Sequence, residues 1–320
     1  MDRNLALEFV RVTEAAAISA AKWVGRGDKH SADGAAVKSM RDRFNDLDFS
    51  GKVVIGEGEM DEAPMLYIGE KLGRGTGIRV DIAVDPLEGT SITAKGLPNA
   101  ISVLAAGPEG SLLHAPDMYM DKIAVGPEAA GKVDLDWPVE KNVRAVANAL
   151  GKEIGEVTVV MLDRDRHKEI IDKVRKIGAR IRLIGDGDIA GGIAPSMPQA
   201  EIDLLLGSGG APEGVIAAAA LKCLGGDMQG RLMFTNEEEK ARAKKMGIAD
   251  LNHKFGMQEL AKGDRLMFVA TGVTEGTILD GVHFTKTGVE THSVVMRSKS
   301  GTIRYIKALH AFGHEIGHKL

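Results

Sequence analysis

Residues 79–91 combine an apolar, β-branched strand pattern with two acids and a run of small polar residues. Pro86 provides no backbone donor and fixes its own φ, so the strand is predicted to end at Asp85. Asp85 and Glu88 then project from one tight turn, and such paired carboxylates suit a hard divalent cation. The Gly-Thr-Ser run at 89–91 follows at a predicted helix start, where bare backbone N–H groups bind phosphate oxygens. The spacing indicates metal-assisted phosphate chemistry.

Other acids follow apolar runs or lie near predicted helix starts. Glu57 lies between two glycines directly after the run 52–55, and glycines allow backbone and metal to approach closely. Glu213 follows a glycine-rich turn after another apolar run, and Asp33 lies near the start of a predicted helix. A lone acid is usually a solvated loop residue or a helix N-terminal charge. Four such places together favour one shared site, because α/β proteins bind ligands at the carboxyl ends of strands.

Length and composition indicate a globular chain of two domains. The 320 residues exceed one ordinary core. We place the boundary within 131–137, giving an N-terminal metal and phosphate domain (1–135) and a C-terminal α/β domain that completes the substrate site (136–320). The single cysteine, Cys223, lies in an apolar segment and is predicted to be a buried hydrophobe rather than a nucleophile.

Charge and hydropathy exclude several kinds of partner. The net charge of −4, without a basic patch interleaved with aromatic residues, argues against nucleic-acid binding. The N-terminus lacks the apolar core of a signal peptide, and the apolar run 215–221 is too short for a membrane span. We therefore expect a cytoplasmic protein with no membrane partner.

The periodicity of apolar residues predicts the order of the elements. Helices are predicted at 4–24, 31–47, 138–150, 167–177 and 212–224. Strands are predicted at 52–55, 79–85, 100–106, 118–125, 157–162, 180–184, 202–206, 266–270, 276–284 and 292–297. Strands and helices alternate after residue 138, which predicts an α/β fold with a partly parallel sheet.

Two loops of the second half carry charges with more than one interpretation. The turn 185–190 matches a relaxed dinucleotide fingerprint, but Asp186 and Asp188 would repel a pyrophosphate and better suit sugar hydroxyls. Arg164 and Arg166 follow the strand 157–162, where they either bind an anion or form ordinary surface charge at a helix start. No Walker-type phosphate loop is present, so ATP-driven chemistry has no support in the sequence.

The segment His314-Glu315-Ile316-Gly317-His318 is a literal zinc-protease pattern, with His310 one helical turn earlier. Gly317 interrupts the helix, and no third ligand follows in this sequence. We therefore favour a frayed helix or tail over a zinc peptidase site.

The Asp85–Thr90 core resembles the metal motif of the lithium-sensitive phosphatases, which include inositol monophosphatases and fructose bisphosphatases. Longer matches narrow the resemblance to class II fructose-1,6-bisphosphatases, at residues 25–29, 55–66, 85–91 and 209–214. The resemblance implies a layered αβαβα-type sandwich with two domains and mixed sheets. It implies hydrolysis of fructose 1,6-bisphosphate to fructose 6-phosphate and phosphate, within gluconeogenesis and glycerol metabolism. A homo-oligomer, dimer or tetramer, is expected.

The resemblance also implies roles, residue by residue. Asp33 and Glu57 would hold one divalent cation, Mn²⁺ or Mg²⁺, and Asp85, Glu88 and Glu213 a second. Substrate-binding positions are Gly89, Thr90, Ser91, Tyr119, Arg164, Arg166, Asp186, Gly187, Asp188 and Gly210. As our own mechanistic hypothesis, Thr90, polarised by a nearby acid such as Asp33, would orient and deprotonate a metal-bound water, with Asp61 or Glu59 assisting. Family members often have proline where this chain has Asp165, an extra acid that bears on affinity rather than on reaction type.

Alternative functions remain beside the fructose-bisphosphatase hypothesis. Another sugar or inositol phosphatase, or an enzyme that also cleaves sedoheptulose 1,7-bisphosphate, would use the same groups. A non-catalytic sugar-phosphate sensor belongs to a different class. It is disfavoured because every matched position carries a competent residue.

Overall fold

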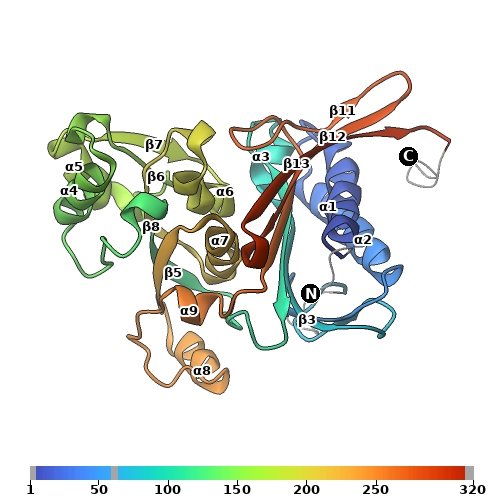
Figure 1. The fold of residues 1–320 in the computed structure, drawn as a ribbon, viewed down its shortest axis with the longest axis horizontal. Helices are drawn as coiled ribbons and strands as arrows, with labels where there is room; N and C mark the ends of the chain where they lie inside the picture. The colour runs from blue at the N-terminus through green and yellow to red at the C-terminus, as the bar shows by residue number, and fades with distance from the viewer. Residues whose placement is uncertain (1–4, 59–63, 314–320) are drawn as a thin grey trace. The chain divides into compact units, whose positions relative to one another are not determined.

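The computed structural model describes residues 5–58 and 64–313, which fold as two compact units (Figure 1). The first unit comprises the chain up to Ser111 together with the segment from Arg265 onward. The second unit is the continuous segment Leu112–Asp264. The chain therefore leaves the first unit once and returns to it.

The first unit is a mixed sheet with helices α1 (Leu5–Ala21) and α2 (Lys29–Asn45) packed side by side against it (Figure 1). The strands are β1 (Ser50–Ile55), β2 (Lys71–Leu72), β3 (Arg79–Glu88), β4 (Ile101–Pro108), β10 (Met267–Gly272), β11 (His283–Phe284), β12 (Gly288–Arg297) and β13 (Thr302–Ala311). They are ordered β11-β12-β10-β4-β3-β1-β2, with β13 paired to β12. Among these described strands, only β1 and β3 pair in parallel.

Apolar residues spaced three or four apart give α1 the buried face that packs on this sheet. Phe9 on α1 contacts Phe44 on α2 and Phe49 edge-on, with ring centroids 6.1 and 5.5 Å apart. Asp28 caps α2 by accepting a hydrogen bond from the Ser31 backbone N–H at 3.0 Å. The first core is therefore formed by the pattern that predicted these two helices.

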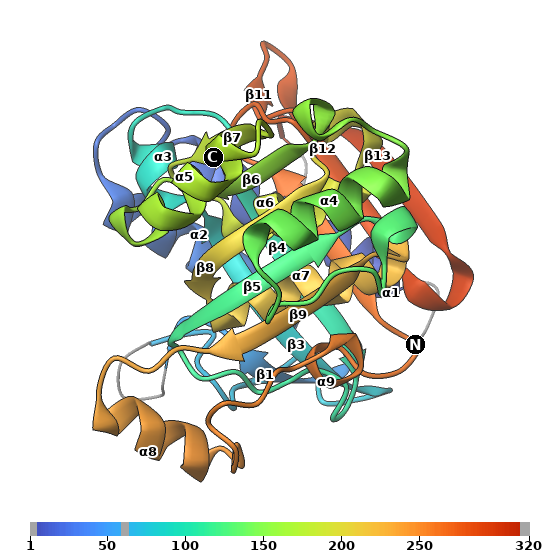
Figure 2. The ribbon, with the colours of Figure 1, turned by 90° about the vertical axis from the view of Figure 1, so that its left-hand side faces the viewer.

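The second unit is a five-stranded mixed sheet with helices on both faces (Figure 2). The strands are β5 (Tyr119–Val125), β6 (Thr158–Leu162), β7 (Arg180–Ile184), β8 (Leu204–Gly210) and β9 (Asp227–Leu232), in the order β7-β6-β8-β5-β9. Helices α4 (Val139–Leu150) and α5 (Lys168–Lys176) cover one face, and α6 (Asp188–Ile193) and α7 (Ala211–Leu224) the other (Figures 1 and 2). The short helices α8 (Glu237–Lys245) and α9 (Met257–Leu260) follow β9.

The predicted α/β fold class with mixed sheets is confirmed. The prediction that a strand ends at Asp85 was wrong, because β3 continues through Pro86 to Glu88. The pairing of β3 with β4 shifts register between Asp85 and Glu88, and this irregularity accommodates a residue without an N–H. The Leu87 N–H donates to Asp85 Oδ1 at 3.1 Å instead of to the sheet.

Two predictions near the C-terminus also differ from the structure. The strand predicted at 276–284 is mostly loop, where Asn99 Oδ1 accepts the Thr277 N–H at 2.9 Å, and only β11 is extended. His310, placed one helical turn before the zinc-protease pattern, lies in β13 and is buried, with Nε2 2.9 Å from Thr291 Oγ1. The pattern itself, residues 314–318, lies outside the described residues.

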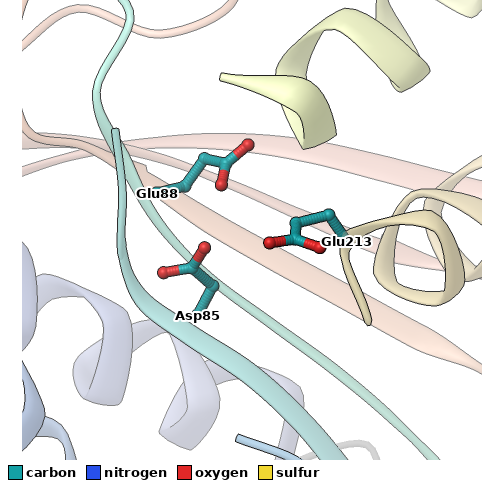
Figure 3. A group of neighbouring side chains, drawn as sticks. All are labelled: Asp85, Glu88 and Glu213. Carbon is teal, nitrogen blue, oxygen red and sulfur yellow. The ribbon is translucent and has the colours of Figure 1, made fainter. Parts of the chain in front are cut away.

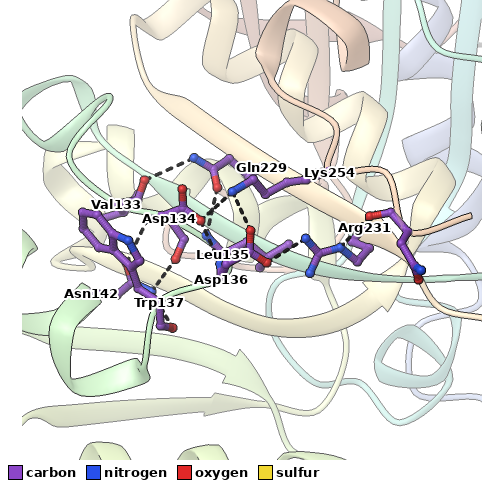
Figure 4. A network of polar contacts seen from close by, with 10 residues as sticks. Val133, Asp134, Leu135, Asp136, Trp137, Asn142, Gln229, Arg231 and Lys254 are labelled. Atoms are coloured by element: carbon purple, nitrogen blue, oxygen red, sulfur yellow. Dashed lines mark hydrogen bonds and ion pairs between the residues drawn. The ribbon is translucent and has the colours of Figure 1, made fainter. Parts of the chain in front are cut away.

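The segment expected to separate two domains lies inside the second unit (Figure 4). Lys254 Nζ donates to Asp134 at 2.6 Å and to Asp136 at 2.8 Å, and Arg231 donates to Asp136 at 2.7 Å. The Gln229 side chain bridges the backbone of Val133 and Leu135. The structural division after Ser111 and Asp264 thus differs from a boundary at 135, because this loop is bonded to β9 and to the segment after α8.

Candidate active site

The acids of the first unit gather where two parallel strands end. β1 and β3 run in parallel, so their carboxyl ends lie at one edge of the sheet. Asp85 and Glu88 lie at the end of β3, with carboxylate oxygens within 4.8 Å of each other. Figure 3 draws this pair, together with Glu213 of the second unit. Glu88 is only 5% exposed, so its charge is stabilised little by bulk water.

Asp33 and Glu57 form a second carboxylate pair in the same unit. Glu57 follows β1 by two residues, and Asp33 lies in the first half of α2. Burial raises the pKa of Glu57 to about 8, and the nearby charge of Asp33 contributes to this rise. Burial also raises the pKa of Asp33, against the opposing effect of His30. Burial is the main cause of both raised pKa values. A cation held by the two carboxylates would lower these pKa values again.

The turn after β3 leads directly into the one-turn helix α3 (Thr90–Ala94), as the sequence predicted. Gly89 has φ 94°, and a Cβ there would lie 2.8 Å from the Ile92 side chain, so glycine is required. Its carbonyl accepts the Thr93 hydroxyl at 2.9 Å, which fixes the turn. Thr90 is partly buried and Ser91 is exposed.

In the second unit, the predicted substrate residues lie at one edge of the sheet. β6, β7 and β8 are parallel, so Arg166, Asp186 and Gly210 follow or end strands at the same carboxyl edge. β5 is antiparallel to β8, and its first residue, Tyr119, pairs with Gly210. The topology therefore brings four separate chain segments together.

Asp186 and Asp188 have different surroundings. Asp186 is partly buried and accepts the Gly187 N–H at 3.2 Å. Asp188 is nearly buried at the start of α6 and forms an ion pair with Lys122. Lys122 also donates to the Gly210 carbonyl at 2.9 Å.

Lys122, which is 2% exposed in the middle of β5, was not predicted from the sequence. The available signal was a lysine inside the strand pattern Met120–Val125, which is otherwise mostly apolar. A buried lysine needs anionic or carbonyl partners, and here they are Asp188 and the Gly210 carbonyl.

Glu213 is placed in the first turn of α7 by the Gly-Gly-Ala-Pro turn before it. A Cβ on Gly210 would collide with Glu213 Oε2, so only glycine leaves room for this carboxylate. That oxygen is buried and has no hydrogen-bond partner among the described residues. Burial raises the pKa of Glu213, and the charge of Lys122 opposes this. A buried oxygen without a donor is the arrangement expected of a cation ligand.

Arg166 and Tyr119 lie together at this edge. The Arg166 guanidinium stacks over the Tyr119 ring, with its carbon 4.6 Å from the ring centroid. Arg164 is exposed and donates to the Asp163 carbonyl at 2.9 Å. Asp165 is exposed and pairs with Lys168 at 2.8 Å, which lowers its pKa. The charge of Asp165 is therefore paired with Lys168, and not with Arg164 or Arg166.

The structure thus groups the predicted acids by unit. Asp33, Glu57, Asp85 and Glu88 lie in the first unit, and Glu213 lies in the second with the predicted sugar and distal-phosphate residues. Asp61 and Glu59, the predicted assisting acids, lie outside the described residues.

Comparison with known proteins identifies the family. The model of the family described as bacterial fructose-1,6-bisphosphatase, glpX-encoded, matches residues 3–310. The chain belongs to this family. It is 49% identical to fructose-1,6-bisphosphatase 1 class 2 of Escherichia coli strain K12, over 97% of this chain and 96% of that protein. The class 2 enzyme of Haemophilus influenzae is 48% identical over 97% of each chain.

Membership in the glpX-type family confirms the resemblance inferred from residues 25–29, 55–66, 85–91 and 209–214. These four segments all lie inside the matched range. No helix in the described ranges is long and apolar enough to cross a membrane.

Proposed function

We propose that this protein hydrolyses the 1-phosphate of fructose 1,6-bisphosphate in a reaction that requires a divalent cation, releasing fructose 6-phosphate. The observation that carries the proposal is the family match across residues 3–310, which includes all the carboxylates described above. The reaction belongs to gluconeogenesis and glycerol metabolism, and we place it in the cytoplasm.

Asp33 and Glu57 would hold one cation, and Asp85, Glu88 and Glu213 a second. All five ligands offer carboxylate oxygens, which suits Mg²⁺ or Mn²⁺ better than zinc. Glu213 Oε2, which has no hydrogen-bond partner within residues 5–58 and 64–313, and the raised pKa of Glu57 support this assignment. When bound, such cations supply positive charge that stabilises the attacking and leaving oxygens of phosphoryl transfer.

The chain's own residues position the reactants. The Thr90 hydroxyl orients the attacking water and passes its proton toward Asp33, which serves as the base. Gly89, Thr90 and Ser91 hold the scissile phosphate through the turn after β3. Gly89 supports this role because its left-handed φ of 94° starts α3 directly after β3, where the first backbone N–H groups of the turn can donate to a phosphate.

Tyr119, Arg164 and Arg166 bind the distal phosphate, and Asp186, Gly187, Asp188 and Gly210 surround the sugar. The stacking of Arg166 on Tyr119 supports the first assignment. The ion pair between Asp188 and Lys122 favours an orienting role for Asp188, since its carboxylate already has a cationic partner. We expect the enzyme to act as a homo-oligomer, either a dimer or a tetramer.

A phosphate-release panel tests the proposal. The purified protein is assayed with Mn²⁺, Mg²⁺ or EDTA on fructose 1,6-bisphosphate, sedoheptulose 1,7-bisphosphate, fructose 1-phosphate and inositol monophosphate. We expect the highest kcat/KM on fructose 1,6-bisphosphate, and no release in EDTA. Preference for inositol monophosphate would assign a different substrate. Sugar-phosphate binding without any hydrolysis would instead indicate a sensor.

A further inference from the structure

His167 connects the backbone of β8 to the segment that carries Arg166. It is 2% exposed and immediately follows Arg166 in the chain. Its Nδ1 lies 2.7 Å from the Leu162 carbonyl at the end of β6. Its Nε2 lies 2.9 Å from the Ser208 backbone N and 3.1 Å from Ser208 Oγ. Both ring nitrogens are therefore occupied by partners on neighbouring strands.

The direction of each hydrogen bond follows from the partners. A carbonyl only accepts, so Nδ1 carries the proton, and Nε2 is left to accept from the Ser208 N–H. Nε2 can also accept the Ser208 hydroxyl proton. The ring contacts the backbone closely, since a Cβ on Gly207, at φ 123°, would lie 3.0 Å from Nε2. His167 thus fixes the backbone of β8 at Gly207 and Ser208.

Ser208 in turn fixes Arg166. The Arg166 Nε donates to Ser208 Oγ at 2.9 Å, and its Nη2 donates to the Ser208 carbonyl at 2.9 Å. This two-point contact holds one edge of the guanidinium, while the Tyr119 ring contacts its face. The Nη1 group has no partner among the residues described, and the side chain is exposed. One donor edge of a fixed guanidinium therefore remains free for an anion.

We propose that His167 is a positioning residue for binding of the substrate's distal phosphate. Through Ser208 it holds the Arg166 guanidinium in an orientation that leaves one donor edge free for the phosphate. The inference rests on the proposed function and deepens it. A free arginine side chain loses rotamer entropy when it binds an anion, and this hydrogen-bonded chain removes that cost before the ligand arrives. His167 contributes to affinity for a phosphorylated sugar without touching it.

Two variants separate positioning from packing. His167→Phe retains the ring and removes both nitrogens, whereas His167→Gln retains an acceptor for the Ser208 N–H. His253→Phe, on a half-buried histidine of the same unit that pairs with Glu259 and not with Arg166 or Ser208, serves as the control. Binding of fructose 6-phosphate is measured by titration calorimetry without metal. KM and kcat are measured on fructose 1,6-bisphosphate and on fructose 1-phosphate, which lacks the distal phosphate.

We expect His167→Phe to weaken fructose 6-phosphate binding about tenfold, equivalent to about 1.4 kcal/mol. KM for the bisphosphate should rise by a similar factor with kcat within about twofold, while kcat/KM for fructose 1-phosphate stays within about twofold. His167→Gln should recover most of the affinity, and His253→Phe should match the wild type.

Equal affinity of His167→Phe and wild type for fructose 6-phosphate would overturn the inference. An equal fall in kcat/KM on fructose 1,6-bisphosphate and on fructose 1-phosphate would also overturn it, because that result would indicate a packing defect. If His167→Phe does not fold, Ser208→Ala removes the Oγ contact alone, and undiminished affinity in that variant would also reject the inference. Wild-type protein that neither binds fructose 6-phosphate nor hydrolyses the bisphosphate would refute the proposed function itself.

Discussion

Thr90 is the residue on which the proposed water activation depends. It begins α3 directly after the Gly89 turn and is partly buried. We expect Thr90→Ala to lower kcat by about 100-fold or more, because a positioned proton-transfer group typically contributes that much. KM should change little, since the loss of the hydroxyl and methyl groups leaves the backbone donors in place.

Steady-state kinetics with saturating Mn²⁺ checks this expectation, and Thr90→Ser, which retains the hydroxyl, is the matched control. Near-normal kcat in the alanine variant would remove Thr90 from the mechanism.

Asp165 is an acid that lies between the two arginines proposed to bind the distal phosphate. Its carboxylate is exposed and paired with Lys168, rather than with Arg164 or Arg166. Exposed pairs of this kind have small energetic effects. We therefore expect Asp165→Asn to change KM for fructose 1,6-bisphosphate by less than about twofold. A tenfold fall in KM would show that the acid does repel the distal phosphate.

At the scale of elements, a buried acid connects α1 to β12 and β13. Glu14 on α1 accepts the Thr291 hydroxyl at 3.1 Å, and burial raises its pKa from 4.5 to about 7. The unfolded chain therefore releases this proton at lower pH than the folded protein does. Glu14 thus makes the free energy of unfolding fall as pH rises from about 5 to about 8, and its contribution levels off once the carboxyl is deprotonated in both states.

Glu14→Gln retains the acceptor oxygen and removes the titration. From pH 5 to pH 8, we expect the wild type to lose about 2 kcal/mol more unfolding free energy than the variant. Burial lowers the pKa of the neighbouring His310, and this effect is shared by both proteins. Urea unfolding at the two pH values measures the difference, and parallel pH dependences would contradict the assignment.

The turn between β3 and α3 depends on glycine for two reasons that can be separated. Gly89 combines φ 94° with a collision of any Cβ against Ile92, whereas Gly110 has φ 78° and no atom within 4 Å of the place that a Cβ would take. We expect Gly89→Ala to lower the free energy of unfolding by about 1–3 kcal/mol more than Gly110→Ala does. If chemical denaturation gives the two variants the same loss of unfolding free energy, the collision between the new Cβ and Ile92 is relieved at no cost.

How much the sequence predicts depends on whether the signal is local. Asp85 and Glu88 are three residues apart, so their proximity was predictable from one turn. Lys122 and His167 were missed because Asp188 and Ser208, which they contact, come from distant segments of the chain. The register of β5 on β8 places Asp121 opposite Ser208, and no residue spacing within either strand encodes that register.

At the scale of the whole molecule, the sequence predicted the fold class but placed the division elsewhere. Residues 267–311 add three long strands to the first sheet, so the chain's last part belongs with its first. Strand pairing between ends of a chain leaves no compositional trace. The family relationship, by contrast, was readable from four short segments, because each of them carries chemistry rather than packing.

The central claim is cation-dependent removal of one particular phosphate. ³¹P NMR of fructose 1,6-bisphosphate incubated with the wild-type protein tests it most directly, in Mg²⁺ and in EDTA. We predict that the 1-phosphate resonance is replaced by inorganic phosphate in Mg²⁺ while the 6-phosphate resonance persists, and that nothing changes in EDTA. Turnover in EDTA, or loss of the 6-phosphate in place of the 1-phosphate, would contradict the account.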